Sequence, residues 1–151
     1  MSDLVETADR LSRRRARMLP VLALFLLTQQ AAFINRPVVA DLVHARPVDQ
    51  VRFGSWAVLT LVLLAALATG GFWFRGRELR ALLNDEQTTA HRRDAMSVGF
   101  VVSALTGVVL YVLASIEPLG AHLAINLIVA LGLAAALIRF GALERRAHKL
   151  G

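Results

Sequence analysis

The chain has 151 residues, of which 56% are hydrophobic and 19% are charged, and its formal net charge is +6. Its positive mean hydropathy and apolar runs of about 20 residues indicate an integral membrane protein instead of one soluble domain. The cations flank apolar segments without interleaved aromatic residues, so direct nucleic-acid binding is not expected. The absence of cysteine excludes disulfides and thiolate chemistry.

The N-terminal segment, residues 1–17, is basic and is predicted to lie in the cytoplasm. Asp3 and Glu6 have the spacing of a capping box, and the segment closes with four arginines: Arg13, Arg14, Arg15 and Arg17. Two interpretations stay open. The segment is either a short interfacial helix whose arginines meet anionic lipid phosphates, or a basic tail that only fixes the orientation of the chain.

The first predicted span runs from about Leu19 to Asn35, with Pro20 in its first turn. Gln29 and Gln30 fall near the middle of this span. Amide side chains in hydrocarbon need partners on a neighbouring helix, so we favour a packing role for both over a role in binding a ligand.

A loop is predicted over residues 36–53. The spacing of Asp41 and His44 could offer two metal ligands, but two candidates do not make a site, and we predict no metal and no cofactor. The second span, residues 54–74, begins near Trp56 and ends with three aromatic residues, as is typical of membrane interfaces.

The central polar run, residues 75–94, is predicted to be a cytoplasmic hairpin. Asn84 resembles an N-cap, with Asp85 and Glu86 in the first turn of a third helix that continues to Ile116. At about 1.5 Å per residue this helix exceeds the roughly 30 Å hydrocarbon core, so two to three turns should project into the cytoplasm.

A stripe of small residues marks the third helix at every fourth position. It comprises Ala95, Gly99, Ser103 and Gly107. Such a face allows another backbone to approach closely, either inside the bundle or in a homodimer, and we favour the intramolecular use. The fourth span, residues 121–140, carries Asn126 near its outer end, where we also expect it to serve helix packing, and the helix is predicted to continue into the basic tail.

The distribution of Lys and Arg predicts the topology. Five precede the first span, five lie in the hairpin and four at the C-terminal end, against three in the first loop and none in the last turn. The positive-inside rule therefore places both termini and the hairpin in the cytoplasm. We expect an all-α, up-down-up-down four-helix membrane bundle, residues 18–151, whose second, third and fourth helices extend into the cytoplasm.

Three functions were weighed against these residues. A small transporter or channel subunit for a neutral polar solute is the alternative, but no Asp or Glu lies at mid-span. An enzyme is not expected, because His91 near Asp85 and Asp94 is the strongest acid–base group and a solvated surface explains it better. A regulatory or adaptor protein is favoured, with a cytoplasmic partner bound by hairpin residues: Leu79, Leu82, Leu83, Asp85, Glu86, Arg92 and Arg93. The leucines of this set could equally pack the second helix against the third.

The hairpin also resembles a group of uncharacterised small bacterial four-span membrane proteins. Their third span opens with an N-D-E motif, a Thr, an Arg and an Ala, matched here by residues in the C-terminal half: Asn84, Asp85, Glu86, Thr88 or Thr89, Arg92 and Ala95. The resemblance implies the bacterial inner membrane as location and a helix-turn-helix transcription factor as the cytoplasmic partner. It supplies no catalytic residues.

Overall fold

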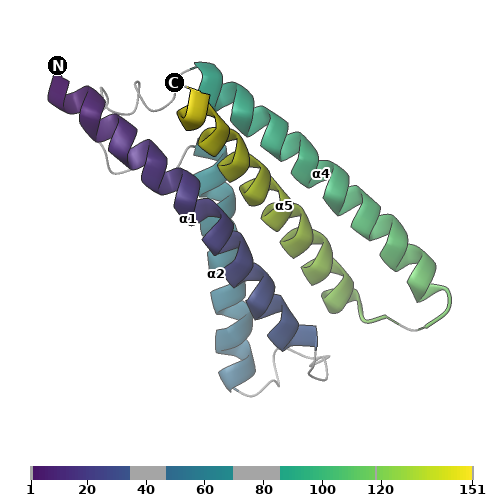
Figure 1. The fold of residues 1–151 in the computed structure, drawn as a ribbon. Coiled ribbons are helices and arrows are strands. Elements are labelled where there is room, and N and C mark those ends of the chain that lie inside the picture. Colours follow the sequence, from purple (N-terminus) through teal and green to yellow (C-terminus); the bar gives the residue numbers. More distant parts are fainter. Residues whose placement is uncertain (1, 35–46, 70–85, 118, 151) are drawn as a thin grey trace.

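The computed structural model describes residues 2–34, 47–69, 86–117 and 119–150, and these are all-helical. Four helices account for nearly all of them, and the described segments contain no strand. Figure 1 shows successive helices running in opposite directions, with both chain ends at one end of the molecule. The all-α prediction is therefore confirmed.

The first helix, α1 (Ser2–Ile34), is continuous over 33 residues. We predicted a basic segment ending at residue 17 and a separate span from Leu19, and the structure shows no break between them. Pro20 consequently lies in the interior of a helix, not in its first turn. The prolines and arginines of a sequence do not reveal this continuity, because it depends on contacts with another helix.

Those contacts come from α5 (Ala121–Leu150). Pro20 has no N–H for the carbonyl oxygen of Ala16, four residues earlier. Arg145 Nε donates to this oxygen over 3.1 Å. Gly141 lies against the proline, and a Cβ atom there would be 3.0 Å from Pro20 Cδ. The last helix thus supplies both the space and the hydrogen-bond donor that the proline requires.

The second helix, α2 (Pro47–Thr69), begins inside the segment that we predicted to be a loop up to residue 53. Pro47 can start a helix because its fixed φ suits the first position, where its missing N–H has no partner to lose. Four residues at helical spacing form the buried face of α2: Trp56, Thr60, Leu63 and Leu67. This helix packs on the others less extensively than α1 and α4 pack on α5.

The third described helix is α4 (Glu86–Ala114), which ends in a turn at residues 115–117, and α5 follows from Ala121. Its predicted N-cap, Asn84, lies outside the described residues. The helix ends two residues before Ile116, where the N–H groups of residues 115–117 bond back to carbonyl oxygens of the last turn. α5 itself runs unbroken into the basic tail, as the sequence indicated.

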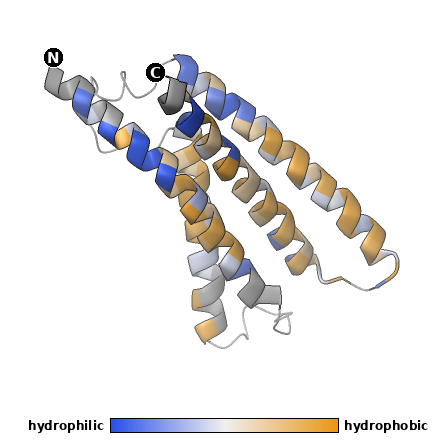
Figure 2. Ribbon diagram, viewed as in Figure 1, coloured by the Kyte–Doolittle hydropathy of each residue, from blue (hydrophilic) through white to orange (hydrophobic). Residues whose placement is uncertain are grey.

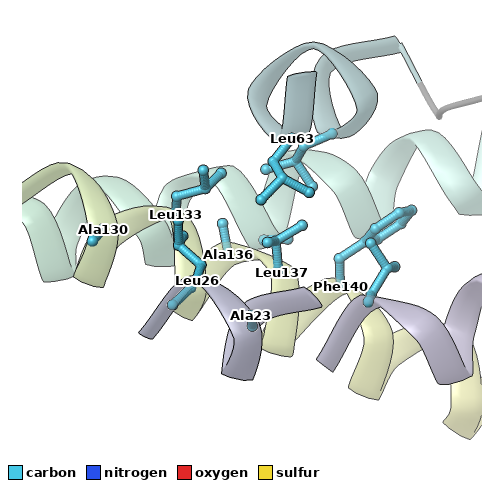
Figure 3. Close-up of a cluster of buried hydrophobic side chains, with 12 residues drawn as sticks. Ala23, Leu26, Leu63, Ala130, Leu133, Ala136, Leu137 and Phe140 are labelled. Atoms are coloured by element: carbon cyan, nitrogen blue, oxygen red, sulfur yellow. The ribbon is translucent and has the colours of Figure 1, made fainter. Parts of the chain in front are cut away.

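The hydrophobic core is centred on α5, which lies between α1 and α4 (Figure 1). Side chains from all four helices meet there, including Ala95 of α4, and Figure 3 labels Leu26 of α1, Leu63 of α2 and Leu137 of α5. α4 approaches α5 most closely at Gly99, where a Cβ atom would lie 2.8 Å from both Ala136 Cβ and the Gly132 carbonyl oxygen.

Two helices are long and apolar enough to cross a bilayer, namely α4 and the part of α5 from Ala121 to Ala147. The apolar part of α2, Gly54–Thr69, is shorter. We predicted four spans, so within the described residues length and composition support two. The exterior of α4 carries large exposed side chains such as Phe100, Leu105 and Tyr111. The most hydrophilic residues gather at the end where both termini lie (Figure 2).

Candidate functional site at the charged end

The end of the bundle that holds residues 6–17, 86–94 and 139–147 is called the charged end below. It contains a buried carboxylate, Glu144, whose relative exposure is 3%. Glu144 follows Leu137 and Phe140 at spacings of seven and four residues, so it continues the buried face of α5. An isolated carboxylate in such a place is unfavourable unless it is paired and hydrogen-bonded.

Glu144 receives its main partners from α1. Arg15 Nη2 donates to Glu144 Oε2 over 2.7 Å, and Ser12 Oγ donates to the same oxygen over 3.1 Å. Arg15 Cζ also lies 5.1 Å from the centroid of the Phe140 ring, a cation–π arrangement. One of our two interpretations placed Arg15 among four arginines that meet lipid phosphates, but its side chain is only 10% exposed and turns inward.

The third helix at this site is α4, which contributes His91. His91 Nδ1 lies 3.8 Å from Glu144 Oε1, an ion-pair distance when the imidazole is protonated. We had placed His91 on a solvated surface near Asp94, whereas its side chain is 19% exposed and faces α5. The prediction of a solvated surface was therefore wrong. We refer to Glu144, Arg15, Ser12 and His91 as the Glu144 cluster.

A second ion pair joins α4 to α5 nearer the solvent. Arg139 Nε donates to Asp94 Oδ2 over 2.8 Å, with both side chains about half exposed. The first turns of α4 are thus held to α5 by His91 and by Asp94, two contacts on one face of the helix.

The arrangement can fix three helices relative to one another. One carboxylate bonds to groups from α1 and faces a group from α4, so movement of either helix would break a buried polar contact. Breaking such a contact leaves an uncompensated buried charge, which is strongly unfavourable. Among the described residues, no group of three His, Cys, Asp or Glu side chains is placed to hold a metal ion.

The predicted partner-binding residues lie partly outside the described segments. These are Leu79, Leu82, Leu83 and Asp85. Of the others, Glu86 and Arg93 are exposed on α4, and Arg92 is half-buried. Glu86, Ala90 and Arg93 share one face of α4, at spacings of four and three residues, and all three are exposed. The structure therefore presents one part of the predicted surface on an anchored helix.

The predicted packing residues of the spans lie between helices. Gln30 Nε2 donates to the carbonyl oxygen of Asn126 over 2.8 Å and to its side-chain oxygen over 2.5 Å, which ties α1 to α5. Gln29 Oε1 and Gln30 Oε1 are buried and lack a hydrogen-bond partner among the described residues. Ser103 Oγ donates to the Ile128 carbonyl oxygen over 3.3 Å. Gly99 lies against α5, while a Cβ atom on Gly107 would find only Ile128, at 3.7 Å.

Two functional candidates were missed from the sequence. Glu144 stands among basic residues in the tail, and only its register with Leu137 and Phe140 indicates that it points inward. Thr60 is buried on α2, and its hydroxyl has no hydrogen-bond partner in the described part of the chain. Thr28, Thr69 and Thr106 differ, because their hydroxyls donate to carbonyl oxygens of their own helices.

Comparison of the chain with known protein families, with curated proteins and with solved structures found no match.

Proposed function

We propose that this chain is a multi-pass protein of the bacterial inner membrane, with four spans and with both termini and the charged end in the cytoplasm. The biased distribution of Lys and Arg supports this orientation. The apolar exterior of α4, α2 and the second half of α1 supports burial of that surface in lipid, because soluble monomers rarely expose so much contiguous apolar surface.

The function that we propose is regulatory: a membrane-embedded, non-enzymatic adaptor that binds a cytoplasmic protein through segment 75–94. One observation carries the proposal. His91 and Asp94 hold one face of the α4 start on α5, and Glu86 and Arg93, seven residues apart on the opposite face, remain exposed. A charged surface on a rigid helix binds a protein partner without a large loss of conformational entropy.

The kind of partner is proposed from the family resemblance. The hairpin resembles that of small four-span proteins, some of which accompany helix-turn-helix transcription factors, so a factor of this class is the partner that we propose. The charged residues of segment 75–94 would then set the specificity for the partner. Like charges that face each other across an interface disfavour a complex by several kcal/mol.

A pull-down of cytosolic proteins tests the adaptor proposal. The double variant Asp85→Lys with Glu86→Lys should capture no partner, while wild-type protein in matched amount captures one stoichiometric protein. Glu117→Lys reverses a charge in the turn beyond the other end of α4 and serves as a control that should bind as wild type. Asn84→Ala, expected to lose only about 1 kcal/mol of capping, should bind as well. Equal capture by wild type and the double variant would contradict the proposal.

A second candidate, passage of a neutral polar solute, is supported by the buried amides and hydroxyl. Gln29, Gln30, Thr60 and Asn126 place polar atoms among apolar helices, and three of these atoms lack partners among the described residues. Glycerol-driven swelling of proteoliposomes distinguishes this function. Swelling that is faster with wild type than with Gln30→Leu would favour transport over the adaptor.

A further inference from the structure

The charged end carries five exposed arginines that have no acidic partner among the described residues. They are Arg14 and Arg17 on α1, Arg93 on α4, and Arg145 and Arg146 on α5. Other arginines at this end are already paired: Arg10 with Glu6, Arg15 with Glu144 and Arg139 with Asp94. Four of the five are without an interhelical hydrogen bond or ion pair among the described residues, while Arg145 also donates from Nε to the Ala16 carbonyl oxygen.

One of these arginines on each helix, namely Arg17, Arg93 and Arg145, borders exposed apolar surface. On α1, Arg17 is followed one and two turns later by Val21 and Phe25, both about half exposed. On α5, Ile138 and Leu131 precede Arg145 at spacings of seven and fourteen residues, which places all three on one face.

The surface of α4 also changes from basic to apolar along the helix. Arg93 is followed by Met96 and Phe100, and both apolar side chains are exposed. Three helices thus pass from guanidinium groups to exposed apolar side chains, and on each of them the apolar part lies away from the chain ends (Figure 2).

Contacts between the helices show that these changes lie within about two helical turns of one another. Arg145 Nε donates to the carbonyl oxygen of Ala16, which is next to Arg17. Arg145 on α5 and Arg17 on α1 therefore lie at similar heights along the bundle. Arg139 donates to Asp94, which is next to Arg93. Arg139 on α5 and Arg93 on α4 therefore lie at similar heights. Residues 139 and 145 are six positions apart, about 9 Å along α5 at 1.5 Å per residue. That depth is comparable to the headgroup layer of one leaflet.

We propose that these five arginines bind the phosphate groups of anionic phospholipids in a single leaflet, and that this contact sets the depth of the bundle in the bilayer. The inference rests on the proposed membrane location but not on the proposed partner. A guanidinium group forms paired hydrogen bonds with phosphate oxygens. A soluble acidic protein would account for the arginines, but not for the apolar surface that adjoins them on three helices.

Native mass spectrometry of the detergent-solubilised full chain tests this proposal. The probes are dioleoylphosphatidylglycerol and dioleoylphosphatidylcholine, which share acyl chains and differ in headgroup charge. Wild type should retain the anionic lipid preferentially. An arginine near an anionic surface contributes about fivefold to binding, so Arg17→Gln should lower that retention about fivefold and Arg14→Gln with Arg17→Gln further.

The matched control is Arg10→Gln, which removes one exposed guanidinium group from the same helix, further from the apolar surface and already paired with Glu6. It should retain lipid as wild type does. Unchanged retention in the double variant, an equal loss in Arg10→Gln, or displacement of lipid by inorganic phosphate would overturn the proposal. Carbonate extraction of membranes distinguishes failure of the proposed membrane location from failure of the proposed lipid contact. Extraction of the protein by carbonate would contradict the membrane location. Retention in the membrane without a preference for anionic lipid would contradict only the lipid contact.

Discussion

At the scale of single residues, burial separates the two ion pairs of the charged end. Arg15 and Glu144 are nearly inaccessible, while Arg139 and Asp94 are about half exposed, although the donor–acceptor distances are similar at 2.7 and 2.8 Å. Solvent screens the exposed pair, so its contribution to stability is small. Loss of one partner from the buried pair leaves the other charge without compensation.

Glu144→Ala should therefore lower the free energy of unfolding by about 3–5 kcal/mol, the range for breaking a buried pair. Asp94→Ala, which breaks the exposed pair between α4 and α5, should lower it by about 0–1 kcal/mol. Denaturant titration of both variants in one detergent measures the difference. Similar losses for the two variants would mean that water reaches Glu144.

Sequence reasoning at this scale identified the right residue types more readily than their orientation. Gln30 and Asn126 were expected to serve packing, and they bond to each other. Arg15 stands in a run of arginines, and no neighbour in the sequence shows that it alone of the run pairs with Glu144. Its orientation follows from the register of Ala16, Leu19 and Ala23, which becomes decisive only when the helix is known to be continuous.

At the scale of elements, the proline in α1 and the arginine in α5 form one structural unit. Arg145→Gln should lower the free energy of unfolding by about 1–3 kcal/mol, because the Ala16 carbonyl oxygen loses its donor. In the Pro20→Ala background the same change should have much less effect, since a residue with an N–H can bond to Ala16 within the helix.

Thermal unfolding of Arg145→Gln, of Pro20→Ala and of the protein with both changes completes this double-mutant cycle. Arg146→Gln, an exposed neighbour with no contact to the Ala16 carbonyl oxygen, is the control. Additive effects would show that Arg145 acts independently of the proline.

The small-residue stripe of α4 contains positions that differ in their surroundings. Gly99→Ala would bring Cβ to 2.8 Å from the backbone oxygen of Gly132, and the overlap should be destabilising by about 1–3 kcal/mol. Gly107→Ala meets only the tip of Ile128 at 3.7 Å and should be neutral or stabilising by up to about 1 kcal/mol through helix propensity. Thermal melts in detergent that rank the two variants in the opposite order would place the close helix contact elsewhere.

At the scale of the whole molecule, the pattern of apolar and basic segments was enough to predict four helices and the gathering of charge at one end. It was not enough to predict which helix lies at the centre. That depends on small residues such as Gly132, Ala136 and Gly141 in α5, which let α4 and α1 approach from two sides. The start of α2 was also missed, because Pro47 reads equally well as a loop residue and as a first helical residue.

The orientation of the molecule is the prediction that belongs to this scale. In a host with a periplasm, alkaline phosphatase fused after Leu83 should be inactive and the same enzyme fused at Pro47 should be active. A cytosolic reporter such as green fluorescent protein at each site is the control, and it should give the reverse pattern. Phosphatase activity at Leu83 with none at Pro47 would invert the proposed topology.

The pairing of α1 with α5 also has a consequence for biosynthesis. The helix α1 leaves the ribosome well before α5, yet the groups that bond to Arg15 and to the Ala16 carbonyl oxygen, Glu144 and Arg145, come about 130 positions later. Contacts between residues so far apart in sequence form late. During translation Arg15 of α1 therefore lacks its Glu144 partner until α5 has been synthesised. Nascent chains that end before residue 121 should be the species that membrane chaperones and quality-control proteases recognise.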